Sequence, residues 1–305
     1  MQWLEVSVSV DPEVAEAVAE VLSRYAPQGV AIDLEVNSSQ LADHVVVKAY
    51  LVADEDIEAR RRKVEESLWH LSCIWPGIPE PTFTSIQDQD WTTGWKESIP
   101  ILHLTKTVVV RPSWREYRQH KEEIVLEMDP GMAFGTGLHP TTQLCAEALE
   151  ALMAPNMRVL DLGTGTGILS LIAAKMGAEE VIAVDTDMNA VAVTRRNARA
   201  NDVAHLVRPV HGSLADVSGT YDLILANILA HVIIDMANAG LAARVRSGGT
   251  LVVSGILLEQ LVEVRAALDR VGLRVVDQRE NGDWVALVAK KAAGMPPNLN
   301  QMRSV

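Results

Sequence analysis

A glycine-rich turn between an apolar strand and a helix is the feature that most constrains this chain. The segment VLDLGTGTGILSLIAAKMGA runs from Val159 to Ala178, and its five residues from Gly163 to Gly167 alternate glycine and threonine. Glycines let the backbone turn sharply there and let a ligand approach the amide groups at the start of the helix. The segment therefore predicts one side of a nucleotide-binding crevice.

The next strand narrows the class of ligand. Asp185 follows Gly163 by 22 residues, at the end of the apolar run VIAVD, where a carboxylate can bind a ribose diol. A dinucleotide-binding turn has its third glycine where this chain has Ile168. The pattern favours adenosine without a pyrophosphate, although Gly-x-Gly-x-Gly turns also occur as plain tight connections in doubly wound sheets.

Composition sets the size and class of the protein. With 305 residues and 48% hydrophobic content, the chain is long enough for two domains with separate cores. No window has the length of a membrane span, and the first ten residues lack the basic cluster of a secretory signal, so we expect a cytoplasmic protein. Cys73 and Cys145 have no zinc-binding or disulfide spacing, which predicts packed thiols and no metal site.

The formal charge of −13 is concentrated at the amino-terminal end. Residues 1–60 contain twelve acidic and three basic side chains, which leaves a net charge of −9. Such a surface repels nucleic acid phosphates and speeds encounter with a basic protein. The alternative is a solvated surface whose charge only keeps the protein soluble.

The periodicity of residues 1–86 predicts a small α+β domain. Its elements follow the order strand, helix, strand, strand, helix, strand, which is that of a ferredoxin-like sandwich. The expected strands are Trp3 to Val10, Val30 to Val36, His44 to Val52 and Thr82 to Ile86, and the expected helices are Pro12 to Tyr25 and Asp54 to Leu71.

Residues 87–118 form an expected connector that packs against the second domain. Trp91 and Trp95 are four residues apart, a helical spacing that favours burial over base stacking, and Thr107 to Val110 reads as a strand.

Residues 119–291 predict an α/β domain with a doubly wound parallel sheet, followed by a loose tail at 292–305. Right-handed crossovers would align the carboxyl ends of its strands along one crevice. The expected strands are Arg158 to Leu162, Glu180 to Asp185, Leu206 to His211, Tyr221 to Ala226 and Thr250 to Ser254, with a closing hairpin of Leu273 to Gln278 and Trp284 to Lys290.

Two further motifs are expected beside the crevice. A glycine-rich loop precedes a helix that should begin at Pro140, and Thr142 in its first turn can offer an amide and a hydroxyl. Asn227 directly follows the strand YDLILA, so its amide side chain should stand where a ligand sits. The plainer alternatives are a capped helix after a flexible loop, and Asn227 as the cap of a helix over Ile228 to Leu241.

The order of these motifs resembles the ribosomal protein L-eleven (L11) methyltransferase family, PrmA. The matching segments are DQDWTTGWKE, DPGMAFGTGLHPTT, DLGTGTGIL, VDTD and ANILA, and the resemblance covers almost the whole chain. It departs from the family at Thr164 and Thr166, where Cys and Ser are more common, and at Leu138, where Thr is more common. These changes bear on affinity more than on reaction type.

The resemblance implies a Rossmann-like methyltransferase domain that uses S-adenosylmethionine, behind a ferredoxin-like domain that docks the substrate. That substrate would be the basic protein L11 at the stalk base of the large ribosomal subunit, methylated on lysine side chains or its α-amino group, with no nucleic acid or membrane required. Carried over by position, Thr142, Gly163, Asp185 and Asn227 would contact the cofactor.

The sequence assigns no residue to catalysis. Methyl transfer from a sulfonium needs alignment and exclusion of water more than acid or base catalysis. Asn227 and the carbonyls after it could accept hydrogen bonds from the incoming amine, and His139 is a candidate proton acceptor on the loop. Two other functions stay open: a dinucleotide-dependent oxidoreductase, which Ile168 opposes, and a non-catalytic ribosome-binding relative.

Overall fold

The chain divides into two compact units, Met1–His139 and Pro140–Val305. The computed structural model describes residues 2–26, 30–37, 40–54, 56–87, 100–129, 137 and 139–292. Among these residues, no helix has both the length and the apolar character to cross a membrane.

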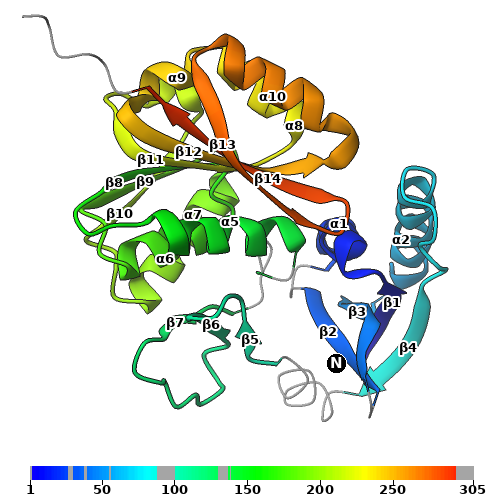
Figure 1. The fold of residues 1–305 in the computed structure, drawn as a ribbon. Coiled ribbons are helices and arrows are strands. Elements are labelled where there is room, and N and C mark those ends of the chain that lie inside the picture. Colours follow the sequence, from blue (N-terminus) through cyan, green and yellow to red (C-terminus); the bar gives the residue numbers. More distant parts are fainter. Residues whose placement is uncertain are drawn as a thin grey trace, which may run out of the picture. The chain divides into compact units, whose positions relative to one another are not determined.

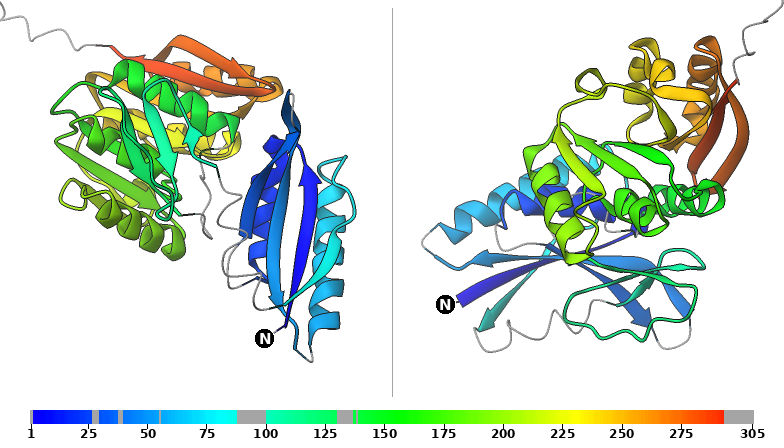
Figure 2. Two further views of the ribbon diagram at one scale, coloured as in Figure 1. Left: turned by 90° about the horizontal axis from the view of Figure 1, so that it is seen from below. Right: turned by 90° about the vertical axis from the view of Figure 1, so that its left-hand side faces the viewer.

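The first unit begins with the expected ferredoxin-like sandwich. A four-stranded antiparallel sheet has the order β2-β3-β1-β4, and helices α1 and α2 cover one face of it (Figures 1 and 2). The elements are β1 (Gln2–Val10), α1 (Pro12–Ser23), β2 (Val30–Asn37), β3 (Gln40–Val52), α2 (Ile57–Ser72) and β4 (Thr82–Gln87). This order confirms the predicted sandwich.

The core of the sandwich follows from two periodicities. Alternate residues of β1, among them Val6 and Val8, point to one face of the sheet because side chains alternate along a strand. Helix α1 buries Val18 and Leu22, one turn apart, against the same core, and α2 adds Leu68. The matching apolar faces hold the sheet and its two helices together.

A small three-stranded sheet follows within residues 100–129. It has the order β5-β6-β7, where β5 (Leu102–His103) is antiparallel and β7 (Ile124–Glu127) is parallel to the central β6 (Val108–Arg111). Strand β6 confirms the strand expected at Thr107 to Val110, whereas β7 was not predicted. The expected positions of Trp91 and Trp95 lie outside the described residues.

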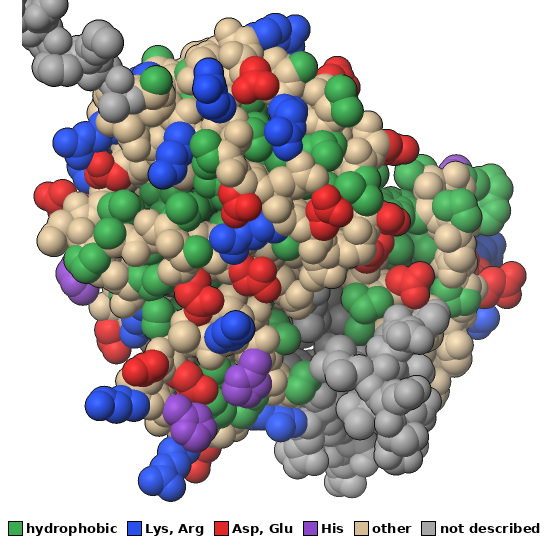
Figure 3. Space-filling model, in the orientation of Figure 1, with side chains coloured by type: hydrophobic (Ala, Val, Ile, Leu, Met, Phe, Trp, Pro, Cys, Tyr) green, Lys and Arg blue, Asp and Glu red, His purple; other side chains and the backbone are tan. Residues whose placement is uncertain are grey.

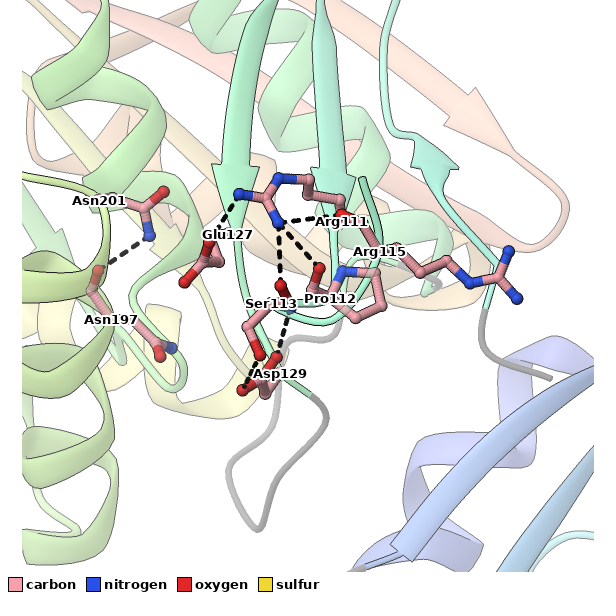
Figure 4. A network of polar contacts seen from close by, with 8 residues as sticks. All are labelled: Arg111, Pro112, Ser113, Arg115, Glu127, Asp129, Asn197 and Asn201. Atoms are coloured by element: carbon pink, nitrogen blue, oxygen red, sulfur yellow. Dashed lines mark hydrogen bonds and ion pairs between the residues drawn. The ribbon is translucent and has the colours of Figure 1, made fainter. Parts of the chain in front are cut away.

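Polar contacts hold the exposed end of this small sheet. Arg111 Nη2 pairs with Glu127 Oε2 at 2.7 Å, which joins β6 to β7 (Figure 4). Asp129 accepts hydrogen bonds from the backbone amide and the hydroxyl of Ser113, at 2.7 and 3.0 Å. The side chain of Arg111 also caps the carbonyls of Pro112 and Arg115. These bonds fix the start of the loop between the two strands.

The second unit is a seven-stranded sheet with helices on both faces, in the order β10-β9-β8-β11-β12-β14-β13. All strands are parallel except β14, which is antiparallel to both of its neighbours. The strands are β8 (Arg158–Leu162), β9 (Glu180–Asp185), β10 (Val207–His211), β11 (Tyr221–Asn227), β12 (Val245–Leu257), β13 (Leu273–Asn281) and β14 (Trp284–Lys291).

Helices of this unit fall into two groups. Figure 1 shows α5, α6 and α7 on one face of the sheet and α8, α9 and α10 on the other. They are α5 (Pro140–Leu152), α6 (Ile168–Lys175), α7 (Met188–Ala200), α8 (Ala230–Asn238), α9 (Leu241–Arg244) and α10 (Leu261–Arg270). The doubly wound sheet and its closing hairpin are therefore confirmed.

The strand order places the functional crevice. The chain steps outward from β8 to β9 and β10, and then returns to the other side of β8 with β11. The order thus reverses between β8 and β11, and ligands of open α/β sheets bind outside the carboxyl ends of the strands at such a point. The glycine turn follows β8, and Asn227 ends β11.

Candidate functional site

The glycine turn after β8 has a backbone that only glycine adopts readily. Gly163, Gly165 and Gly167 have φ angles of 72°, 56° and 84°. Side chains other than hydrogen strain this left-handed region. At Gly167 there is also no room, because a Cβ atom would lie 2.8 Å from Cγ2 of Thr194 on α7. The close approach of α6 to α7 therefore depends on Gly167.

The amides of the turn are used mainly to hold its shape. Val184 O, on β9, accepts hydrogen bonds from the nitrogens of Gly163 and Thr164 at 2.8 and 3.0 Å. The Gly167 nitrogen bonds to Thr164 O, and the Gly165 nitrogen bonds to Asp185 Oδ2 at 2.9 Å. The turn therefore presents to a ligand an oriented carboxylate, more than a set of unused amides.

Asp185 lies at the carboxyl end of β9, beside the turn, as its spacing from Gly163 predicts. Its Oδ2 accepts from Gly165 and its Oδ1 accepts from the Asp187 nitrogen at 2.9 Å. A carboxylate oxygen has two lone pairs, so each oxygen can still accept one hydroxyl. The two backbone bonds thus hold the carboxylate in the orientation needed to bind a diol.

A buried carboxylate beneath the turn escaped the sequence analysis. Asp161, on β8, is 1% exposed, and its Oδ2 accepts hydrogen bonds from Thr164 Oγ1 at 2.8 Å and Ser170 Oγ at 2.6 Å. Burial raises the pKa of Asp161 to about 6, against the opposing effect of these two hydroxyls. The only signal in the sequence was one acidic residue inside an apolar strand.

Thr142 and Asn227 meet in space although 85 residues separate them. The Nδ2 atom of Asn227 donates to Oγ1 of Thr142 at 3.4 Å, and Thr142 is 1% exposed in the first turn of α5. Helix α5 begins at Pro140, as predicted. Because Nδ2 is used in this bond, the side-chain oxygen Oδ1 of Asn227 is the atom that can accept a hydrogen bond from a ligand.

The helix-cap interpretation of Asn227 is wrong. Helix α8 begins at Ala230, and its N-cap is Leu229. Asn227 is instead the last residue of β11, one residue before the extended connection into the helix. The chain stays extended through Leu229, with φ −60° and ψ 140°, so the side chain of Asn227 belongs to the strand end.

Three further predicted positions have definite outcomes. His139 is 5% exposed, and desolvation lowers its pKa to about 4, so the imidazole is neutral at pH 7. Cys145 is buried, as expected, and burial raises the pKa of its thiol to about 12. Cys73, next to the end of α2, is exposed, so its expected packing was wrong.

The loop residues Gly131, Gly135 and Leu138 lie outside the described residues, and Gly137 has a φ of 93°. Among the described residues, no group of three His, Cys, Asp or Glu side chains could hold a metal ion. On the face drawn in Figure 3, acidic and basic side chains are interspersed.

Comparison with known proteins gives consistent results. The model of the family "Ribosomal protein L11 methyltransferase (PrmA)" matches residues 2–292. Two relatives described as ribosomal protein L11 methyltransferase, from Herpetosiphon aurantiacus and Chloroflexus aurantiacus, are 41% and 40% identical to this chain. Each alignment covers 95% of this chain, with 99% and 98% of the respective relative.

A solved structure gives the same indication. The crystal structure of a ribosomal protein L11 methylase from Lactobacillus delbrueckii subsp. bulgaricus aligns with a TM-score of 0.59 and 32% identity. The alignment covers 63% of this chain and 98% of that one.

Proposed function

This chain belongs to the ribosomal protein L11 methyltransferase (PrmA) family, and on that premise we propose that it methylates ribosomal protein L11 with S-adenosylmethionine. We further propose that the methyl groups go to nitrogen, on lysine side chains or the α-amino group. The observation that best supports this is the position of Asn227 at the end of β11. Strand β11 lies next to β8, and the glycine turn that follows β8 orients the carboxylate of Asp185. A doubly wound sheet places these carboxyl ends at one crevice.

The residues of the crevice fit the proposed cofactor. Asp185 offers two oriented oxygens for the ribose hydroxyls, and Gly163, with a φ of 72°, gives the turn beside it the sharp bend that a side chain would strain. Thr142 and Asn227, joined by their hydrogen bond, would bind the amino acid end. When bound, S-adenosylmethionine would supply a methyl group on a sulfonium: the amine nitrogen bonds to the methyl carbon as the C–S bond breaks in line, and the sulfur leaves as a neutral thioether. Thr142, Gly163, Asp185 and Asn227 are thus the proposed cofactor contacts.

The acceptor nitrogen must be uncharged to react. With a pKa of about 10.4, only about one lysine in 2,500 is neutral at pH 7, which corresponds to roughly 4 to 5 kcal/mol. An α-amine with a pKa near 8 needs only about 1 to 1.5 kcal/mol. A desolvating site lowers this cost because it disfavours the charged form. We propose that the Asn227 carbonyl oxygen accepts a hydrogen bond from the amine and directs its lone pair.

The two ends of the chain have different proposed roles. Residues 1–86, with most of the acidic excess, would bind the basic protein substrate, and residues 119–291 would bind the cofactor and carry out transfer. Residues 87–118 would connect them, and 292–305 would form a tail. We place the reaction in the cytoplasm, with no nucleic acid or membrane required.

Purified enzyme, purified L11 and S-adenosylmethionine carrying a labelled methyl group test the function. We expect label on L11 at lysine or α-amino positions located by mass spectrometry. If no label appeared on L11 although calorimetry showed that the cofactor binds, the result would favour a non-catalytic ribosome-binding relative. Binding of NAD but not of S-adenosylmethionine would point instead to an oxidoreductase.

A further inference from the structure

Ile228 lies between two glycines that belong to different parts of the crevice. A Cβ atom built on Gly163, in the turn after β8, would lie 2.3 Å from Cγ2 of Ile228. A Cβ atom built on Gly255, in β12, would lie 2.3 Å from the Ile228 oxygen and 2.8 Å from its carbonyl carbon. Real Cβ atoms do not come so close to other atoms, so both approaches require glycine.

The two contacts are of different kinds. Gly163 receives the side chain of Ile228, whereas Gly255 receives its backbone. A side chain can rotate to admit part of a new methyl group, whereas the Ile228 peptide is held by its hydrogen bond to Ser254 and has less freedom to move. Gly255 therefore fixes the peptide of Ile228, and Gly163 fixes the direction of its side chain.

Hydrogen bonds hold the same peptide from the side of β12. The Ile228 nitrogen donates to Ser254 O at 3.1 Å, which continues the pairing of Asn227 with Ser254. Ser254 is fully buried, and its hydroxyl donates to Val285 O on β14 at 3.0 Å. The position of Ile228 is thus tied to two strands of the sheet as well as to the turn.

Both neighbours of Ile228 lie at the carboxyl end of β11. Asn227 precedes it with the proposed acceptor carbonyl, and Leu229 follows it with a side chain that is 62% exposed. A displacement of the Ile228 peptide would move both residues relative to the glycine turn. We propose that Ile228, held between Gly163 and Gly255, is a positioning residue that sets the separation between the methyl acceptor and the donor turn. This inference rests on the proposed function.

Gly255→Ala tests the backbone contact, and Gly248→Ala is its matched control. Both glycines lie in β12 with left-handed φ angles, 82° and 77°, but a Cβ atom on Gly248 meets nothing within 4 Å. The conformational strain is therefore similar, and only Gly255→Ala displaces Ile228. A shift of about 1 Å can cost about 100-fold in rate. We expect Gly255→Ala to lower kcat by that factor and to raise the Kd for S-adenosylmethionine by a smaller factor, because Asp185 keeps its place, and Gly248→Ala to keep kcat.

The side-chain contact has its own test, which holds if Gly255→Ala does not fold. Ile228→Val keeps the Cγ2 methyl group that lies on Gly163, and Ile228→Leu keeps the volume but loses that branch. We expect Ile228→Val to retain most of kcat and Ile228→Leu to lose about 10-fold, with KM for L11 unchanged in both.

The outcomes separate this inference from the proposed function. Equal kcat values for Gly255→Ala and Gly248→Ala in folded protein, or equal values for the two Ile228 variants, would overturn the positioning role. A wild-type enzyme that transfers no methyl group to L11 would overturn the proposed function and the inference with it. Thermal unfolding of each variant shows whether a fall in kcat arises only because a smaller fraction of the protein is folded.

Discussion

The Gly165 nitrogen donates a hydrogen bond to Asp185 Oδ2 at 2.9 Å, so the turn after β8 and the acidic end of β9 hold each other in place. The spacing of Asp185 from Gly163 predicted that the strand end lies near the turn, but not this bond. It means that Asp185 has a fixed orientation before any ligand arrives, which lowers the ordering cost of binding.

Asp185→Ala should weaken cofactor binding. Hydrogen bonds to charged groups contribute about 1.5 to 3 kcal/mol, so we expect the Kd for S-adenosylmethionine to rise about 10- to 100-fold in calorimetry. Asp187→Ala is the control, because Asp187 caps α7 through the Asn189 nitrogen and accepts no bond from the turn among the described contacts. Its loss should cost about 1 kcal/mol of stability and leave the Kd within twofold. Similar Kd values for both variants would remove Asp185 from the cofactor site.

Asn227→Ala should reduce turnover far more than folding stability. The variant loses the proposed acceptor for the amine, and we expect kcat to fall by about 100-fold, as for other groups that orient a reacting atom. Asn238→Ala, at the exposed end of α8, is the control and should keep wild-type kcat. Thr142→Val removes only the hydroxyl that receives Nδ2 of Asn227, so its loss of kcat should be smaller. Unchanged kcat in folded Asn227→Ala would contradict this role.

Ionisation of Asp161 should lower stability as the pH rises. Its pKa is raised by burial to about 6 in the folded protein, above the unfolded value, so the folded state favours the protonated acid. The stabilising contribution is full below the unfolded pKa and is lost as the pH rises through about 6. Between pH 5 and 7, urea unfolding should show wild type losing about 1 kcal/mol relative to Asp161→Asn. A constant difference between the two proteins would mean that Asp161 does not titrate in this range.

His139 should carry no charge in the working pH range. Desolvation lowers its pKa to about 4, below the unfolded value, so its contribution to stability is present above about 6.5 and is lost as the pH falls toward 4. NMR of labelled histidine should show no titration of this ring between pH 6 and 8. The rise of kcat with pH should then come from the acceptor amine and persist in His139→Gln. If the plot of kcat against pH showed a transition near pH 6.5 in wild type and His139→Gln abolished it, His139 would instead have a proton-transfer role.

The sequence predicted best those strands that are continuous apolar runs followed by a turn signal. Strands β8 and β9 match their expected bounds because each is a buried apolar run ending at a turn signal. Strand β12 extends from Val245, beyond the expected Thr250, because its first residues are polar and glycine-rich and carry no strand signal. Strand β7 has only four residues and is recognised by its pairing with β6.

The rest of the site depends on contacts between distant segments. The bond of Thr142 to Asn227 joins residues far apart in sequence, and nothing local indicates it. Asn227 alone is compatible with both a strand end and a helix cap, and the pairing of β11 with β12 decides between them. Likewise, nothing in the sequence around Gly255 indicates that this position requires glycine; the requirement comes from its contact with the peptide of Ile228.

The antiparallel β14 has a consequence for how the protein is made. Strand β13 is synthesised before β14, yet among the described strands it pairs only with β14, which enters between it and β12. While the carboxyl-terminal segment is still inside the ribosome, β12 therefore has a bare edge, and the hydroxyl of Ser254 lacks Val285 as its acceptor. The edge of β12 that carries Ser254 and Gly255 is therefore completed only after β14 has been synthesised and has paired with it.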